Sequence, residues 1–398
     1  MTETTNDDGL AVFNHLRAVL ASSPASASPV SALAAAANMS AEDVGILVAR
    51  HAQLTPAAWI DRERVAFATR FLVEGKAGEG MAGDAGFSSH AAYERTFARH
   101  MAMSPDDYVS ALKSDRFHLR LPPGYRKAEV LAYQGRDPEG LAERVDGMCI
   151  HKALMTGDGP AILHVDLTRA NAAVTLESPR RLGRRSVAKL HMDALKILGL
   201  TGNAKEFERI HPTLVAGRAG LRVPLIPSAF DALCWAIVGQ QINLAFAGSL
   251  RRYLIEVAGT PVGSMRVHPT PRAIADLDPS SLTANRFSRA KVKYLLAAAE
   301  AVASGQLAIE ELWQGSAVEA EAKLTAQHGV GTWTARYVLM RIGFGDSAPV
   351  GDSGLATALQ RLHNLAHRPD IVETARLMAP YTPWRSLASM HLWASLRG

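Results

Sequence analysis

The spacing of apolar residues divides the chain into three segments of different character. In the first, short apolar runs recur at helical spacing between turns. In the second, short apolar runs separated by turn residues, at 117–121, 161–167 and 172–176, indicate strands. In the third, the helical pattern continues almost throughout. We therefore expect a mainly α protein with a small α+β middle domain, and domains at residues 10–112, 115–205 and 206–398.

The first segment contains two similar halves. In each half a short Ala-rich run meets a turn, a serine is placed to N-cap the next helix, and a Ser-Pro or Thr-Pro pair begins the helix after that. A short helix, a tight turn and a capped helix form the helix-turn-helix pattern, whose second helix enters the major groove of DNA. The serines are Ser40 and Ser88, and the pairs are Thr55-Pro56 and Ser104-Pro105.

The second half carries the more specific motif. The segment Gly86-Phe87-Ser88-Ser89, with Tyr93, Phe97 and Ser104-Pro105 at their distances, resembles the AraC/XylS-type double helix-turn-helix module. The resemblance implies promoter DNA as a partner, with contacts expected at Ser88, Ser89, His90, Tyr93, Arg95 and Arg99. The corresponding helix of the first half carries Glu42 and Asp43, whose negative charges disfavour contact with the phosphates of DNA. The alternative is that the module is retained for packing and has little DNA affinity of its own.

The stretch from Leu324 to Leu355 carries the strongest candidate chemistry. Its segment Gly329-Val330-Gly331 interrupts two apolar helical runs, and a turn with two glycines lets backbone N–H groups face a phosphate. Nineteen residues after Trp333, a turn that contains Pro349 and Gly351 can present Asp352 at the mouth of a pocket. A hairpin followed by an acid at this distance resembles the helix-hairpin-helix DNA glycosylases, and most closely their bacterial alkylpurine branch, the AlkA-type 3-methyladenine glycosylase II enzymes.

The resemblance implies a catalytic carboxylate and a DNA-binding hairpin. Positive charge builds on the sugar as an N-glycosidic bond breaks, and a fixed carboxylate stabilises that charge and can orient the attacking water. We expect Asp352 in this role, with Asp346 as its rival and Ser353 as the match if the alignment shifts by one residue. The alternative for Asp352 is a structural cap on the next helix. The hairpin is expected to hold the DNA backbone with Gly329, Val330, Gly331 and Thr332.

The resemblance also implies a wedge residue, an aromatic pocket and a reaction type. Gln241, with Gln240, stands where the family inserts a side chain into the duplex, although two amides can instead cap or bridge helices. Relatives that also cut the strand carry a lysine two residues after the second hairpin glycine, where this chain has Trp333, so no lyase activity is expected. Aromatic faces attract a cationic alkylpurine, although aromatics at helical spacing also form cores. The pocket candidates are Trp333, Tyr337, Trp384 and Trp393.

Composition and charge exclude several other classes. The two cysteines, Cys149 and Cys234, cannot build a disulfide framework or a four-ligand zinc or iron-sulfur site, and we expect no metal and no cofactor. No Pro-Cys-His-Arg site for accepting methyl groups is present. The 398 residues carry a net charge of +5, include no signal peptide and have no apolar run long enough to span a membrane. We expect a cytoplasmic, nucleoid-associated bacterial protein that acts as a monomer.

The leading hypothesis is a monofunctional DNA glycosylase with a separable helix-turn-helix arm. It would excise alkylated purines of the 3-methyladenine and 7-methylguanine class from double-stranded DNA in base excision repair, through an all-helical helix-hairpin-helix domain. The alternative is a transcriptional regulator of the alkylation response whose glycosylase-like domain is catalytically degenerate. An acid at position 352 beside an aromatic pocket favours the enzyme.

Overall fold

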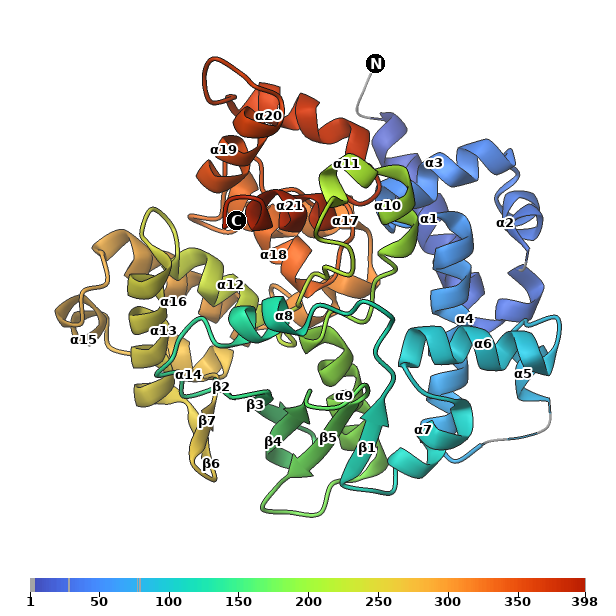
Figure 1. The fold of residues 1–398 in the computed structure, drawn as a ribbon, viewed down its shortest axis with the longest axis horizontal. Helices are drawn as coiled ribbons and strands as arrows, with labels where there is room; N and C mark the ends of the chain where they lie inside the picture. The colour runs from blue at the N-terminus through green and yellow to red at the C-terminus, as the bar shows by residue number, and fades with distance from the viewer. Residues whose placement is uncertain (1–3, 28, 77, 79, 398) are drawn as a thin grey trace.

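The computed structural model describes residues 4–27, 29–76, 78 and 80–397, and shows a mainly helical protein with a five-stranded sheet at its lower edge in the view of Figure 1. The mainly α fold class is confirmed. Within the described residues no single helix has the length and apolarity of a membrane span, although the bent pair of residues 30–37 and 41–51 meets both criteria together.

The N-terminal segment forms the two predicted helix-turn-helix halves. The predicted cap at Ser40 is confirmed, since its side chain accepts from the N–H group of Asp43. The Thr55-Pro56 and Ser104-Pro105 pairs begin helices as predicted, and in the structure Thr55 and Ser104 also cap them. The predicted cap at Ser88 is wrong by one residue, because Ser89 accepts from the N–H group of Ala92 at 3.2 Å. The elements are α1 (Thr4–Ser22), η1 (Pro24–Ala27), α2 (Val30–Ala37), α3 (Ala41–His51), α4 (Pro56–Val73), α5 (Met81–Asp84), α6 (His90–Met101) and α7 (Pro105–Ala111).

The middle segment forms a five-stranded antiparallel sheet in the order β1-β5-β4-β3-β2. Helix α9 packs on one face through Val187 and Leu190. The hairpin of β6 (Thr260–Val262) and β7 (Met265–Val267) packs on the other through Val262 and Met265. The sequence predicted strands only near β1, β4 and β5. The elements are β1 (Arg116–Leu119), α8 (Lys127–Gln134), β2 (Glu143–Asp146), β3 (Cys149–Thr156), β4 (Gly159–Asp166), β5 (Ala172–Glu177) and α9 (Arg184–Ile197).

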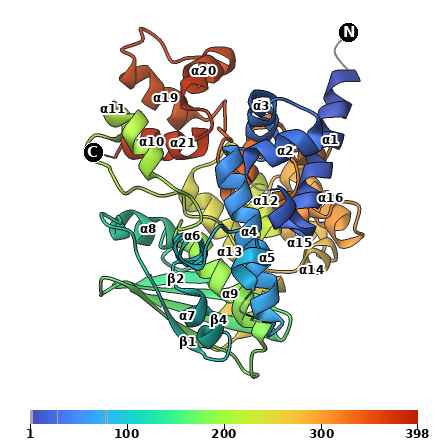
Figure 2. The same cartoon turned by 90° about the vertical axis from the view of Figure 1, so that its right-hand side faces the viewer.

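The second helix-turn-helix half shares its hydrophobic core with the sheet. Phe97 and Tyr108 belong to one buried cluster with Leu119 of β1, Leu163 of β4 and Leu190 of α9. Both views place α7 beside β1 (Figures 1 and 2). This shared core argues against a separable arm, because removing the arm would take apolar cover from the sheet domain.

The C-terminal segment is helical except for one short hairpin, β6–β7, which the helical pattern did not predict. Helix α12 is buried along its whole length, and its core is separate from a second core around α19 and α21. The helices before the hairpin turn are α10 (Lys205–Ile210), α11 (Pro212–Val215), α12 (Ala229–Val238), α13 (Leu244–Ala258), α14 (Pro271–Ala275), α15 (Pro279–Ala284), α16 (Arg289–Ala303), η2 (Ile309–Gln314) and α17 (Ala317–Thr325). The remaining elements are β6 (Thr260–Val262), β7 (Met265–Val267), α18 (Thr332–Ile342), α19 (Ser353–Leu362), α20 (Ile371–Met378), η3 (Ala379–Tyr381) and α21 (Arg385–Ala394).

Candidate active site

The predicted hairpin is the turn between α17 and α18. Gly329 adopts a φ of +81°, and Val330 is buried and anchors the turn. Gly331 is the N-cap of α18 and has no side chain that could accept from the first N–H groups of the helix. These donors are therefore available to an outside acceptor such as a phosphate oxygen.

The two hairpin glycines differ in how much room surrounds them, and this predicts different effects of substitution. A methyl group at Gly329 would lie 2.2 Å from the ring of Tyr294, whereas a methyl group at Gly331 meets nothing within 4 Å. We expect Gly329→Ala to destabilise the protein by about 1–3 kcal/mol, because it adds backbone strain to this overlap, and to weaken binding of undamaged duplex. Thermal melting and fluorescence anisotropy measure the two effects. The matched variant Gly331→Ala should melt like the wild type, and equal melting of Gly329→Ala would contradict the prediction.

The loop between α12 and α13 contacts the hairpin through Gln240. Its Nε2 donates to the carbonyl oxygen of Gly329 at 3.0 Å and to Oγ1 of Thr334 at 3.1 Å, and Lys291 donates from Nζ to its backbone oxygen. The prediction of Gln240 as a wedge is wrong, because its amide bridges helices, as the alternative held. Gln241 is exposed and has a φ of +57°.

Asp352 is the N-cap of α19 and is partly exposed. Its Oδ1 accepts from the N–H group of Leu355 at 2.8 Å and from Nε1–H of Trp393 at 2.9 Å. No described residue donates a hydrogen bond to Oδ2. Asp352 therefore does cap α19, and it uses only Oδ1 to do so. The indole of Trp393 fixes this same oxygen, and Oδ2 is left for a reacting group.

The rival acid, Asp346, has a different environment. It is 4% exposed and accepts from Nε and Nη2 of Arg385, both at 2.8 Å. It also accepts from the backbone N–H group of Arg385 at 3.1 Å. Such a bidentate pair clamps the loop to the start of α21 and occupies both carboxylate oxygens of Asp346. Ser353 is the exposed first residue of α19.

An aromatic cluster reaches Asp352 through Trp393. Trp333 stacks on Tyr337 with ring centroids 5.6 Å apart, and the hydroxyl of Tyr337 accepts from Nε1–H of Trp235 at 3.0 Å. The guanidinium carbon of Arg341 lies 5.3 Å from the ring centroid of Tyr337 and 5.7 Å from that of Trp393. Two residues from α18, one from α12 and one from α21 thus form a single cluster around a buried cation.

Trp384 does not share these contacts. Its ring lies edge-on to Phe207, with centroids 6.4 Å apart, in the C-terminal core. It is the N-cap before α21, whereas Trp393 lies on the last turn of that helix. The prediction of Trp384 as a pocket residue is wrong for this reason.

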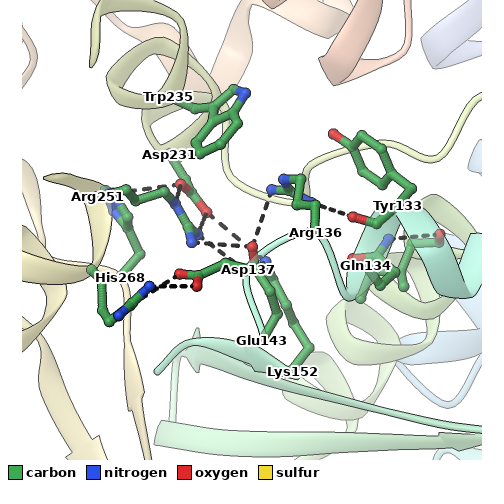
Figure 3. A network of polar contacts seen from close by, with 12 residues as sticks. Tyr133, Gln134, Arg136, Asp137, Glu143, Lys152, Asp231, Trp235, Arg251 and His268 are labelled. Carbon is green, nitrogen blue, oxygen red and sulfur yellow. Dashed lines mark hydrogen bonds and ion pairs between the residues drawn. The ribbon is translucent and has the colours of Figure 1, made fainter. Parts of the chain in front are cut away.

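Four further side chains belong to the cluster and were not predicted from the sequence. They are Tyr133, Arg136, Trp235 and Arg341, of which Arg341 could have been found because it follows Tyr337 by four residues on the same helix. Arg136 lies between the rings of Tyr133 and Trp235, with its guanidinium carbon 4.5 Å and 4.9 Å from the two centroids (Figure 3). The guanidinium carbon of Arg341 is also 4.5 Å from the ring centroid of Tyr133.

A buried ion network lies beneath this cluster and joins the sheet to the helical domain (Figure 3). Arg251 donates to Glu143 at 3.1 and 3.0 Å and to Asp231 at 3.0 and 2.8 Å, and Nη2 of Arg136 lies 3.0 Å from Glu143. Lys152 also pairs with Glu143. Burial alone would raise the pKa of the Glu143 carboxyl, but Arg251, Lys152 and Arg136 outweigh burial and hold that pKa well below its usual range. The Glu143 carboxyl is therefore ionised around neutral pH.

The described residues contain no group of three or more His, Cys, Asp or Glu side chains that could hold a metal ion. Cys149 and Cys234 are both free thiols.

The predicted DNA contacts of the second helix-turn-helix half divide into two groups. Tyr93 is 3% exposed and packs between Phe87 and Phe97, so its prediction as a DNA contact is wrong: it faces the core of its own module. Nη2 of Arg99 donates to Asp61 at 2.5 Å, which ties it to α4. The remaining predicted contacts, including the capping Ser89, are exposed: Ser88, Ser89, His90 and Arg95.

Comparisons with known proteins agree with this geometry. Residues 234–383 match the family described as HhH-GPD superfamily base excision DNA repair protein, and residues 33–111 match a helix-turn-helix domain. The chain is 38% identical over 182 residues to a DNA-3-methyladenine glycosylase of Bacillus subtilis strain 168, covering 44% of this chain and 60% of that protein. It is 31% identical over 192 residues to a protein named probable bifunctional transcriptional activator/DNA repair enzyme AlkA of Mycobacterium tuberculosis H37Rv, covering 46% of this chain and 36% of that one.

Among solved structures, the fold is similar to that of a 3-methyladenine DNA glycosylase from Archaeoglobus fulgidus. The TM-score is 0.62 at 20% sequence identity, and the match covers 71% of this chain and 98% of that chain. At this identity the likeness concerns the fold. The chain spans about 60% of the length of the curated relatives that it matches at 38% and 30% identity.

Proposed function

We propose that this chain, which combines an HhH-GPD domain of the base excision DNA repair superfamily with a helix-turn-helix domain, is a monofunctional DNA glycosylase for alkylated purines. The observation that carries the proposal is the hydrogen bond of 2.9 Å from the indole of Trp393 to Asp352, which joins an acid to an aromatic cluster. The substrate class would be 3-methyladenine and 7-methylguanine in duplex DNA, and the first of these bases appears in the printed name of the Bacillus subtilis relative.

The proposed chemistry assigns one role to each oxygen of the catalytic carboxylate. The indole of Trp393 and the N–H group of Leu355 fix Oδ1, so Oδ2 can face the sugar or the attacking water. A negative charge held in place stabilises the cationic sugar that forms as the base departs. Trp333 occupies the position where a lyase would need an amine, so the product is an abasic site in an intact strand.

The proposed DNA-binding surface combines the hairpin with the exposed Gln241. Backbone N–H groups at Gly331 and Thr332 would bind phosphate without selecting sequence. Extruding a base costs a few kcal/mol, and Gln241 filling the gap would offset part of that cost. Its φ of +57° turns the chain sharply at the tip of its loop, which suits a projecting side chain.

The helix-turn-helix module would contribute further DNA contacts through the start of α6. We assign this role to Ser88, His90 and Arg95, which are exposed. We expect the protein to act as a monomer. A regulator with a degenerate glycosylase domain is not favoured, because such a protein would not need an acid held by an indole beside an aromatic cluster.

Base release from methylated DNA tests the proposal. The purified protein is incubated with methylated duplex, and the free bases are separated by chromatography. We expect release of 3-methyladenine or 7-methylguanine, no release from unmethylated duplex, and strand breaks only after alkali treatment. If no base is released, the enzyme proposal fails; if breaks form without alkali, the monofunctional assignment fails.

A further inference from the structure

The first helix-turn-helix half contacts the segment that leads to the proposed catalytic acid. Gln53 lies in the turn between α3 and α4 with a φ of +54°. Its Oε1 accepts from the N–H group of Asp346 at 2.8 Å and from Oγ–H of Ser347 at 3.1 Å. One side chain therefore holds two successive residues of the loop that ends at Asp352.

Further hydrogen bonds fix the N-terminal helices to the C-terminal domain near this loop. Nδ1 of His51 and Oγ of Ser316 lie 2.7 Å apart, and the two residues are only 2% and 1% exposed. Nη1 of Arg17 donates to the carbonyl oxygen of Gln314 at 2.6 Å. Helices α1 and α3 are thus fixed to the segment from η2 to the start of α17, so Gln53 is held against the loop from its own side.

From the loop, the contacts continue into α21. Asp346 is clamped by Arg385 at the start of that helix. Oγ of Ser386 accepts from the N–H group of Ser347 at 3.1 Å and donates to the carbonyl oxygen of Phe344 at 2.7 Å. Helix α21 carries Trp393 on its last turn, and Trp393 holds Asp352. Gln53 therefore contacts the loop that leads to Asp352 directly. Through Asp346 and Ser347 of that loop it is also connected to α21, whose Trp393 indole orients Asp352.

We propose that the N-terminal module is a positioning element of the glycosylase site, and that Gln53 is the positioning residue through which it acts. The inference rests on the proposed function of Asp352. Without the acceptor at position 53, the buried N–H group of Asp346 and hydroxyl of Ser347 lose their shared partner, and the loop is free to shift. A displacement of about 1 Å at reacting groups can cost a hundredfold in rate. This also gives the first half, whose α3 offers Glu42 and Asp43, a function that needs no DNA.

The test uses the full chain and separates catalysis from binding. Gln53→Met keeps the size of the side chain and removes the acceptor, and Gln53→Glu keeps an acceptor oxygen. We expect Gln53→Met to lower the single-turnover rate of base release about tenfold, equivalent to about 1.4 kcal/mol, with an unchanged Kd for a short duplex containing an abasic site. Gln53→Glu should restore the rate to within about twofold. Ser347→Ala, which removes one of the two contacts, should give a smaller decrease and serves if Gln53→Met does not fold.

A matched control distinguishes positioning from general loss of stability. Ser40 caps α3 through the N–H group of Asp43 and has no contact with the loop. Ser40→Ala should lower the melting temperature and leave the rate of base release unchanged. The inference is overturned if Gln53→Met releases base as fast as the wild type, if Gln53→Glu does not restore the rate, or if Ser40→Ala slows release equally. A wild type that releases no base overturns the proposed function itself, and this inference with it.

Discussion

Asp352→Asn is expected to slow base release by at least about a hundredfold while leaving the fold intact. Asparagine is as good an N-cap as aspartate, so α19 keeps its first hydrogen bond. Its amide oxygen can still accept from the indole of Trp393. The substitution therefore removes little besides the negative charge that would stabilise the cationic sugar. The single-turnover rate on methylated duplex and the thermal melting curve measure the two expectations.

The same substitution at another helix start provides the control. Asp370 caps α20 by accepting from the N–H group of Glu373 at 2.8 Å, and no aromatic side chain donates to it. Asp370→Asn should release base at the wild-type rate. If Asp352→Asn also does so, the assignment of the catalytic acid is wrong, even though the chain can still be a glycosylase.

Arg251→Met is expected to destabilise the folded protein by about 3–5 kcal/mol, because it leaves two buried carboxylates without their main partner. Arg251 is 3% exposed and donates to both Glu143 and Asp231. Urea unfolding measures the change. The matched variant Arg272→Met breaks an exposed pair with Glu300 and should change the unfolding free energy far less than Arg251→Met, because solvent screens the exposed pair. Equal losses for the two variants would contradict a special role for the buried network.

The stability difference between the wild type and Arg251→Met should depend on pH. In the wild type, burial alone would raise the pKa of Asp231, but Arg251, His268 and Lys152 hold it well below the ordinary value. A carboxyl with a lowered pKa stabilises the fold above the unfolded pKa, near pH 4, and this contribution is lost as the pH falls toward the folded pKa. Without Arg251 the folded pKa rises, so the variant accepts protons at higher pH. The difference in unfolding free energy between the wild type and Arg251→Met should be largest at neutral pH and should become smaller below about pH 5.

The features that the sequence predicted correctly depend on short segments. The hairpin follows from two glycines between two helices, and Gly329 does adopt a positive φ. The cap at Ser40 and the helix starts at Thr55-Pro56 and Ser104-Pro105 likewise need only a few neighbouring residues. Their hydrogen bonds close within three residues, so no knowledge of the distant chain is required.

The errors arise where distant contacts decide the structure. Strand β3 was missed because Lys152 and His151 interrupt its apolar pattern, and Lys152 can be buried only because Glu143 of the next strand pairs with it. Tyr133 and Arg136 joined the aromatic cluster from another domain, which no local pattern shows. Tyr93 was placed on a groove face, although its position on α6 faces Phe97 of its own module.

The core that α6 and α7 share with the sheet also limits how the protein can be engineered. A designer who moved the helix-turn-helix unit onto another enzyme would need to transplant the apolar surface of α9 with it, including Leu190 and Ala194. Without that surface, the transplanted unit would expose an apolar patch and tend to aggregate. The helix-turn-helix unit of this chain is thus a poor candidate for modular fusion, even though its sequence resembles that of an independent domain.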